Sequence, residues 1–218
     1  DDISVVGIHL SNPTVARTAA VNTAVGDSLQ AYDMHPTASH IFSLVSGEGD
    51  DHNGLFTLAG SSGFNYLRLN GSLAEFAAGS ILSVRVRVEG EYDGFHLGGS
   101  YEGILKIKVI DAPGAPSISR LTVKNDDTVV VDITPPASDG ESPITQYTAT
   151  AYPVSGGSLA PISNTSATPV VELTGLEYGE AYRIKVKASN SAGTGPESAP
   201  SEEVTLKMRP KITFTPTG

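Results

Sequence analysis

The sequence predicts an all-β protein made of two β-sandwich domains in tandem. Its 218 residues suffice for two ordinary domains, each large enough to bury a core without disulfides. Charged residues make up only 17% of the chain, while 23 glycines and 14 prolines supply the turns that many short strands require. Apolar and polar residues alternate with a period of two in several segments, and no segment shows the 3.6-residue period of a long amphipathic helix.

Residues 1–111 form the first predicted sandwich. Its clearest strands are Ile81–Val88 and Tyr101–Ile110, in which hydrophobic residues alternate with arginine or lysine. Shorter apolar segments bounded by turn residues bring the set to about seven strands, as a sandwich requires: Ile3–Leu10, Val15–Leu29, Ile41–Val45, Leu55–Leu58 and Tyr66–Leu69. A metal site or a pH-sensitive patch could be formed by Asp33, His35, His40, Asp50, Asp51 and His52. We interpret these as solvated turn residues instead, because Asp50–Gly54, DDHNG, has the composition of an ordinary turn.

Residues 5–111 resemble a cadherin-like domain of the divergent kind common in bacterial surface proteins. Two segments carry the resemblance: Phe42–Phe56, FSLVSGEGDDHNGLF, and Ser72–Gly94, SLAEFAAGSILSVRVRVEGEYDG. The resemblance implies an immunoglobulin-like sandwich. It also implies that calcium is held between successive domains by carboxylates at defined positions.

Most of those acidic positions are replaced in this chain. Arg17 stands where the family has an early glutamate, and Ala112-Pro113-Gly114 replaces most of the acidic cluster at the domain exit. The carboxylates that remain as calcium candidates are Asp33, Glu75, Glu89 and Asp111. Because calcium takes six to eight oxygen ligands, we expect no cofactor, and inter-domain calcium is the alternative.

Residues 112–116, APGAP, form a short linker between the predicted domains. Pro113 and Pro116 restrict its backbone, and the segment is too short for a flexible connection. We therefore expect the two domains to occupy a limited range of relative orientations.

Residues 117–208 form the second predicted sandwich. Alternating or short apolar segments mark its strands: Ile118–Val123, Thr128–Ile133, Ile144–Ala151, Val170–Leu173, Tyr182–Ala188 and Glu203–Leu206. Asn190–Pro196 contains two glycines and a proline, a composition that predicts an exposed loop. Residues 209–218 are predicted to be a tail or the start of a further domain.

This second region resembles a fibronectin type III domain. The resemblance rests on Thr134–Pro153, TPPASDGESPITQYTATAYP, and on Leu173–Pro196, LTGLEYGEAYRIKVKASNSAGTGP. It implies that Leu176 lies in a tight corner and that Tyr182 buries its ring and returns its hydroxyl to upstream backbone. It also implies that Ile133 stands in place of a core tryptophan, which leaves a smaller or repacked core.

No segment carries a recognisable catalytic motif, so we expect the chain not to be an enzyme. The glycine-serine segments Gly60–Gly63 and Gly98–Gly103 lack the spacing of a nucleophile elbow and are interpreted as turns. The net charge of -10 opposes binding to nucleic acid, and no apolar run is long enough to span a membrane in this fragment. The absence of cysteine excludes disulfides and thiolate sites, and it is typical of bacterial surface repeats.

These observations predict a non-catalytic structural or adhesion module, a semi-rigid stalk segment of a larger bacterial protein at the cell surface or outside the cell. Its expected partners are neighbouring domains of the same polypeptide and a cell-surface protein or glycan. One alternative is a spacer or sugar-binding region of a secreted polysaccharide-degrading enzyme, with Tyr32, Tyr66, Tyr92 and Phe95 as candidate stacking residues. A second alternative is a self-associating subunit of an extracellular filament, sheath or virion tail.

Overall fold

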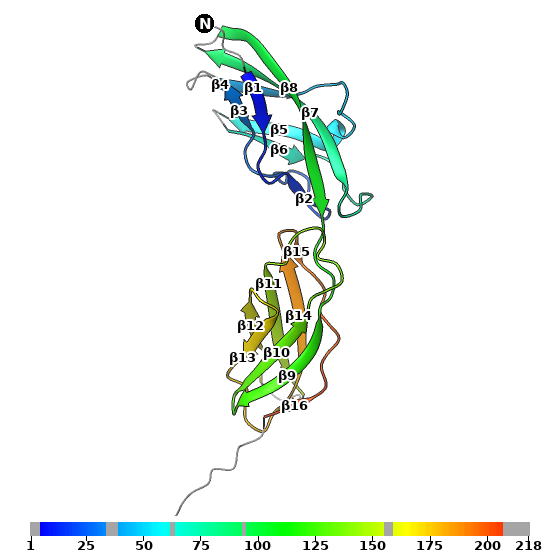
Figure 1. The fold of residues 1–218 in the computed structure, drawn as a ribbon, viewed down its shortest axis with the longest axis vertical. Coiled ribbons are helices and arrows are strands. Elements are labelled where there is room, and N and C mark those ends of the chain that lie inside the picture. The colour runs from blue at the N-terminus through cyan, green and yellow to red at the C-terminus, as the bar shows by residue number, and fades with distance from the viewer. Residues whose placement is uncertain (1–4, 34–38, 62–63, 93–94, 155–158, 207–218) are drawn as a thin grey trace, which may run out of the picture. The chain divides into compact units, whose positions relative to one another are not determined.

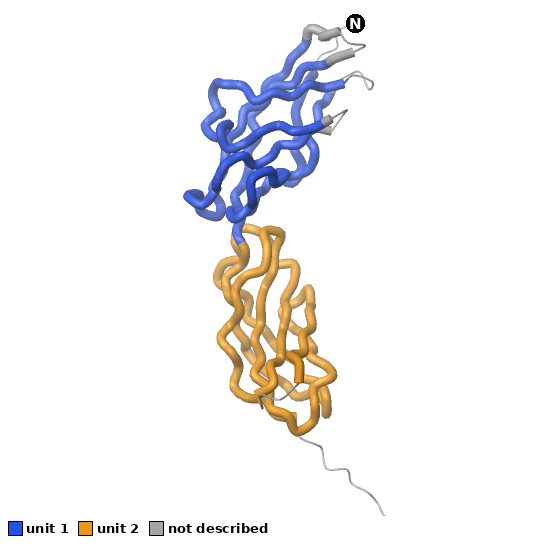
Figure 2. The backbone as a smooth tube through the Cα atoms, turned by 180° about the vertical axis from the view of Figure 1, so that it is seen from behind, with its two compact units in different colours: residues 1–111 blue, residues 112–218 orange. Residues whose placement is uncertain are grey.

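The chain separates into two compact β units. The computed structural model describes residues 5–33, 39–61, 64–92, 95–154 and 159–206. Unit 1 comprises residues 1–111 and unit 2 residues 112–218 (Figure 2). Each unit has its own core between β-sheets, which confirms the predicted all-β fold of two sandwiches (Figure 1). The predicted tail, residues 209–218, lies outside the described residues.

Unit 1 is built from eight described strands and one short helical turn. They are β1 (Val5–His9), β2 (Thr14–Ala16), β3 (Gln30–Asp33), β4 (Ser39–Leu44), η1 (Asn53–Leu55), β5 (Phe56–Ser61), β6 (Phe64–Leu69), β7 (Ile81–Tyr92) and β8 (Phe95–Ile110). One sheet has the order β2-β8-β7-β4, while β5 pairs with β6 and β1 pairs with β3. The pairing of β2 with β8 is parallel, and the other described pairings in the unit are antiparallel.

The core of unit 1 follows from the alternation along its longest strands. Leu82, Val84, Val86 and Val88 of β7 are fully buried, while Arg85 and Arg87, which alternate with them, point to the other face of the sheet. Leu82, Val84 and Val86 pack against residues from β5, β6, β8 and the neighbouring loops: Phe56, Leu67, Leu69, Ile107, Val109, Val25, Leu29 and Leu73. The segment before β3 adds to the β5-β6 pair through isolated bridges, so two layers enclose this core.

The glycine-serine segment Gly98–Gly103 is not a turn. It continues β8, which runs without interruption from Phe95 to Ile110 opposite β7. Gly103 faces Val86 across the ladder, and a β-carbon there would lie 3.2 Å from the Tyr101 ring. Glycine in a strand commonly marks such a close approach, and composition alone does not separate that role from a turn.

The described residues of unit 2 form eight strands in two sheets. They are β9 (Ser117–Asn125), β10 (Thr128–Thr134), β11 (Gln146–Pro153), β12 (Ile162–Ser166), β13 (Val170–Leu173), β14 (Ala181–Asn190), β15 (Gly193–Thr194) and β16 (Val204–Thr205). One sheet has the order β13-β10-β9, and the other has the order β12-β11-β14-β15, with β16 also pairing with β14. The arrangement is visible in the lower part of Figure 1.

Two tyrosines fill much of the unit 2 core. Tyr147 of β11 and Tyr182 of β14 are 5% and 1% exposed. Ala149, Ala151 and Ala188 on the same two strands are also fully buried. Because their side chains are small, they leave volume in the close-packed core for the two rings. Ile133, predicted to replace a core tryptophan, is also buried in this cluster.

Among the residues that the structure describes, none forms a helix with the length and hydrophobicity that crossing a bilayer requires.

Candidate functional site

The four calcium candidates lie on separate elements of unit 1. Asp33 ends β3, Glu75 is exposed in the turn before β7, and Glu89 lies in β7. A guanidinium nitrogen of Arg87 lies 2.9 Å from a Glu89 carboxylate oxygen. Within the described part of the chain, no group of three or more histidine, aspartate or glutamate side chains is placed to hold a metal ion.

The fourth candidate, Asp111, pairs with a cation instead of joining other carboxylates. The Arg17 guanidinium bonds the Asp111 carboxylate through both Nε, at 2.8 Å, and Nη2. The backbone N–H of Arg17 also donates to the carbonyl of Ile110 at 2.8 Å. Both nitrogens bond the same carboxylate oxygen, Oδ2, and this ion pair holds the last residues of unit 1 to the segment that follows β2.

The first residues of unit 2 are held in a comparable way. The N–H of Gly114 donates to the carbonyl of Ser138 at 2.9 Å. The backbone at Pro113 packs so tightly on Gly195 that a β-carbon at Gly195 would lie 2.1 Å from the Pro113 carbonyl oxygen. Pro113 and Pro116, predicted to stiffen the linker, are both buried. The segment that enters unit 2 is therefore part of that unit's packed structure.

The Asn190–Pro196 segment is a tight turn that is exposed only in part: Ser191, Thr194 and Pro196 are exposed, as its composition predicted, while Asn190 and Gly195 are buried. Strands β14 and β15 pair at once, with Asn190 opposite Gly193, so that only two residues form the connection. Asn190 is 7% exposed, and its side-chain nitrogen donates to the carbonyl of Asp139 at 2.6 Å. Its side-chain oxygen accepts the N–H groups of Ala192 and Gly193. One buried amide thus fastens this turn to the β10-β11 loop, a contact that sequence patterns do not show.

Tyr182 closes the corner between β13 and β14. Its ring lies in the core, and its hydroxyl oxygen accepts the N–H of Glu177 at 2.9 Å. Leu176, beside it, is 3% exposed and donates its N–H to the carbonyl of Asp127 at 3.0 Å. The two residues therefore tie the corner both to the core and to the β9-β10 turn.

Replacing Tyr182 by phenylalanine should lower the free energy of unfolding of unit 2 by roughly 1–2 kcal/mol, because the Glu177 N–H loses its partner while the ring stays buried. Urea denaturation measures the change. The matched control is Tyr178→Phe, since Tyr178 is 55% exposed and lies in the same corner. Equal effects of the two substitutions would contradict this role of the Tyr182 hydroxyl.

A charged cluster on β11 and β14 holds the segment that follows β15. The Glu197 carboxylate accepts hydrogen bonds from Lys185 Nζ and from the Tyr152 hydroxyl, both at 3.0 Å, and lies 3.3 Å from Lys187 Nζ. The Lys185 ammonium also lies 5.5 Å from the centre of the Tyr152 ring. The hydrogen bonds from Lys185 and Tyr152 lower the pKa of Glu197 from 4.5 to about 2.

The stability of unit 2 should decrease as the pH falls from about 4.5 towards about 2. The folded-state pKa of Glu197 lies below its unfolded value, so its contribution is complete above the unfolded pKa and is lost on acidification. Thermal melts across this pH range should show a shallower dependence for Glu197→Gln than for the wild type. An unchanged pH dependence in that variant would contradict the assignment.

Two serines replace regular strand pairing along the edge of β14. Ser198 donates its N–H to the Val186 carbonyl at 2.9 Å, and its hydroxyl accepts the Val186 N–H at 3.1 Å. Ser201 makes the same pair of bonds with Ile184, at 2.8 and 2.9 Å. The backbone N–H and carbonyl groups of Ile184 and Val186 on the edge of β14 are thereby hydrogen-bonded, while Ala199-Pro200 between the two serines is exposed. An edge covered by a segment that contains proline resists pairing with other chains.

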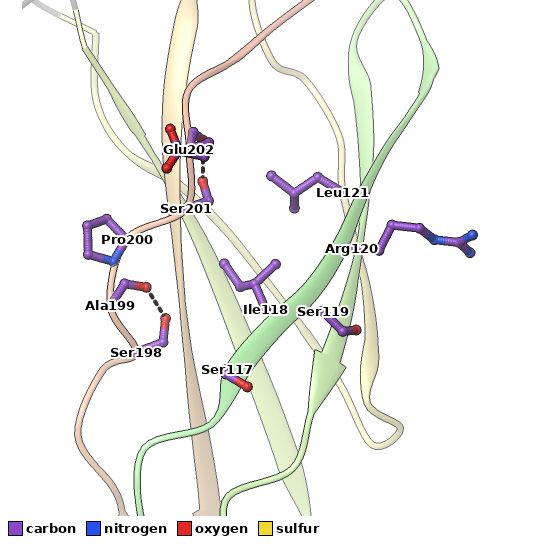
Figure 3. A pocket seen from close by; sticks show the side chains of 10 residues that line it. All are labelled: Ser117, Ile118, Ser119, Arg120, Leu121, Ser198, Ala199, Pro200, Ser201 and Glu202. Carbon is purple, nitrogen blue, oxygen red and sulfur yellow. Dashed lines mark hydrogen bonds between the residues drawn. The ribbon is translucent and has the colours of Figure 1, made fainter.

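A groove of about 480 Å³ opens between this segment and β9 (Figure 3). Ile118 and Leu121 point into it from β9 and pack against the core, while Arg120 points away and pairs with Asp132. The hydroxyls of Ser198 and Ser201 donate to the carbonyls of Ala199 and Glu202, so each already has a donor and an acceptor role. The groove therefore lies at the edge of the hydrophobic core. Its two serine hydroxyls are hydrogen-bonded to backbone, so neither is an activated nucleophile.

Two of the four aromatic residues considered for sugar stacking, Tyr32 and Tyr66, have described side chains. Tyr32 is 53% exposed, and its ring centre lies 6.2 Å from that of His9. The guanidinium carbon of Arg68 lies 5.9 Å from the ring centre of Tyr66, on a different pair of strands. The side chains of Tyr92 and Phe95 lie outside the described residues.

Comparison with known proteins supports the assignment of unit 2. Residues 114–204 match the model of the fibronectin type III domain, which confirms the predicted presence of that domain. A titin homolog of Caenorhabditis elegans is 31% identical over 110 residues, which are 50% of this chain and 1% of that protein. The chain thus spans a very small part of this relative.

One solved structure covers both units. A crystal structure of domains from titin aligns with 92% of this chain and 65% of its own length, with a TM-score of 0.57 and 20% identity. At this identity the likeness concerns the fold alone, and it agrees with two immunoglobulin-like sandwiches in tandem. The cadherin-like resemblance of residues 1–111 and a bacterial origin stay predictions.

Proposed function

We propose that this chain is a non-catalytic structural segment of a larger polypeptide, a semi-rigid spacer made of two β-sandwich units. The fibronectin type III match and the fold shared with titin domains support a modular structural role. The polar clusters of the described residues are used to fasten segments to sheets, as at Asn190, Glu197 and the serines beside β14.

The observation that carries the proposal is how the connecting residues are held. Arg17 fixes Asp111 to unit 1. In unit 2, Gly114 is fixed by its hydrogen bond to Ser138, and Pro113 is fixed by its packing on Gly195. Only Ala112 lies between Asp111 and the anchored Pro113, and proline has a restricted φ. A connection of this kind suits a spacer that limits the freedom of what it joins.

A distance measurement tests the spacer role directly. The chain has no cysteine, so the substitutions Glu75→Cys and Thr174→Cys give one unique spin-label position in each unit, both exposed. Pulsed electron paramagnetic resonance should give a narrow distance distribution. Inserting a Gly-Ser segment after Ala112 should broaden it, and Arg17→Ala should broaden it to a smaller degree. A wild-type distribution as broad as that of the insertion variant would refute the proposal.

The proposal also places the parent polypeptide at the cell surface or outside the cell. It is supported by the cadherin-like segment Phe42–Phe56 and by the absence of cysteine, which is common in bacterial surface repeats. Labelling of intact cells with a membrane-impermeant reagent tests this location, since an intracellular parent protein would stay unlabelled.

A further inference from the structure

The N-terminal part of β7, before Val86, has no described neighbouring strand on the edge where β4 pairs with the rest of β7. Strand β4 pairs with β7 from Ser39 opposite Glu91 to Leu44 opposite Val86 and then ends. The N–H and carbonyl groups of Ser83 and Arg85 continue the same edge beyond that point. An uncovered run of such groups is a template for pairing with another chain.

The loop predicted to be a solvated turn covers this edge. Val45 and His52 donate their N–H groups to the carbonyls of Arg85 and Ser83, both at 3.2 Å. In return the N–H of Arg85 donates to the side-chain oxygen of Asn53 at 2.8 Å, and the N–H of Ser83 donates to His52 Nδ1 at 3.1 Å. Two adjacent side chains thus supply the acceptors that a β-strand would otherwise provide.

These two acceptors differ in how they respond to protons. An amide oxygen accepts hydrogen bonds at any physiological pH, whereas an imidazole nitrogen accepts only while the ring is neutral. Once the ring is protonated, both of its nitrogens are donors, and Nδ1–H would face the N–H of Ser83. The bond at Ser83 therefore requires neutral His52, while the bond at Arg85 does not depend on pH.

A cation and an aromatic ring lie beside the contact between His52 and Ser83. Lys106 Nζ donates to the Ser83 hydroxyl at 2.7 Å, which places a positive charge at the same residue of β7. The ring of His52 packs edge-on against Phe76, with centres 5.6 Å apart. The acidic residues on the adjoining segments are Asp50, whose carboxylate accepts the Gly47 N–H, and the exposed Asp51 and Glu75.

We propose that His52 is a pH-dependent latch on the edge of β7. Neutral His52 closes the edge at Ser83, and protonation opens it there while Asn53 continues to hold Arg85. The latch acts on a single strand edge of unit 1 and does not depend on the spacer role.

Amide hydrogen exchange of the full chain tests the latch, with Arg85 as an internal control. Protection factors are measured by NMR at about pH 7.5 and about pH 5, near the two ends of the range in which histidine side chains change charge. Protection at Ser83 should fall roughly tenfold or more at the lower pH, as expected for the loss of one backbone hydrogen bond, while protection at Arg85 should change little.

Two variants sharpen the result. In His52→Asn the side-chain oxygen is attached to the same carbon that carries Nδ1 in histidine, so Ser83 should stay protected at both pH values. In His52→Leu no acceptor remains, and Ser83 should be unprotected at both. The proposal is overturned if wild-type Ser83 shows no pH dependence, if His52→Asn shows the same dependence as the wild type, or if Arg85 loses protection together with Ser83.

Discussion

Replacing Ile184 by alanine should destabilise unit 2 by about 2–5 kcal/mol and leave unit 1 unchanged. Ile184 is fully buried at the centre of β14, between the two sheets of unit 2. Its loss leaves a cavity that close-packed neighbours fill only in part. Urea denaturation followed by hydrogen exchange of peptides from each unit measures the two transitions separately.

The reciprocal substitution Leu82→Ala completes the test. Leu82 is fully buried in the unit 1 core, so its replacement by alanine should destabilise unit 1 by a similar amount and leave the stability of unit 2 unchanged. Val123→Ala is the surface control, since Val123 is 43% exposed on β9. If either core substitution shifted both transitions equally, the two cores would not be independent, contrary to the spacer proposal.

The sequence predicted the strands best where alternation decides the side-chain direction. Along β14, Tyr182, Ile184, Val186 and Ala188 are buried and Arg183, Lys185 and Lys187 are not, as their spacing indicates. Burial of one face is a local property of such a strand. It can therefore be derived without knowing what packs against it.

The loops were predicted less well because their contacts are made with distant residues. Asn190 was interpreted as part of an exposed loop, yet its side-chain amide donates to the carbonyl of Asp139 and accepts the N–H of Gly193. The Asp50–Gly54 turn has ordinary turn composition, yet two of its side chains complete the hydrogen-bond ladder of β7. His52 bonds Ser83, 31 residues further along the chain, and Asn53 bonds Arg85, 32 residues further along. Turn propensity describes local conformation and does not specify such partners.

Arg17 and Asp111 illustrate a site that sequence reasoning described only by what it lacks. The departure from the family's acidic pattern lowered the expectation of calcium. The resemblance placed Arg17 near the remaining carboxylates but did not pair it with Asp111, which is 94 positions away. In the structure the guanidinium bonds the carboxylate at the end of unit 1. A fixed cation in such a position can orient a carboxylate without a metal ion.

Replacing Gly195 by alanine should destabilise unit 2 by about 1–3 kcal/mol, since the added methyl group meets backbone that cannot rotate away. A β-carbon there would lie 2.1 Å from the Pro113 carbonyl oxygen and 3.3 Å from that of Gly114, so the entering segment must shift. The Gly114 amide, which donates to Ser138, should then lose protection from hydrogen exchange. The matched control is Gly114→Ala, whose β-carbon would meet its neighbours at 3.5 Å or more, an ordinary contact distance. If Gly195→Ala were as stable as that control and kept the Gly114 amide protected, the entering segment would not be fastened to unit 2 by this contact.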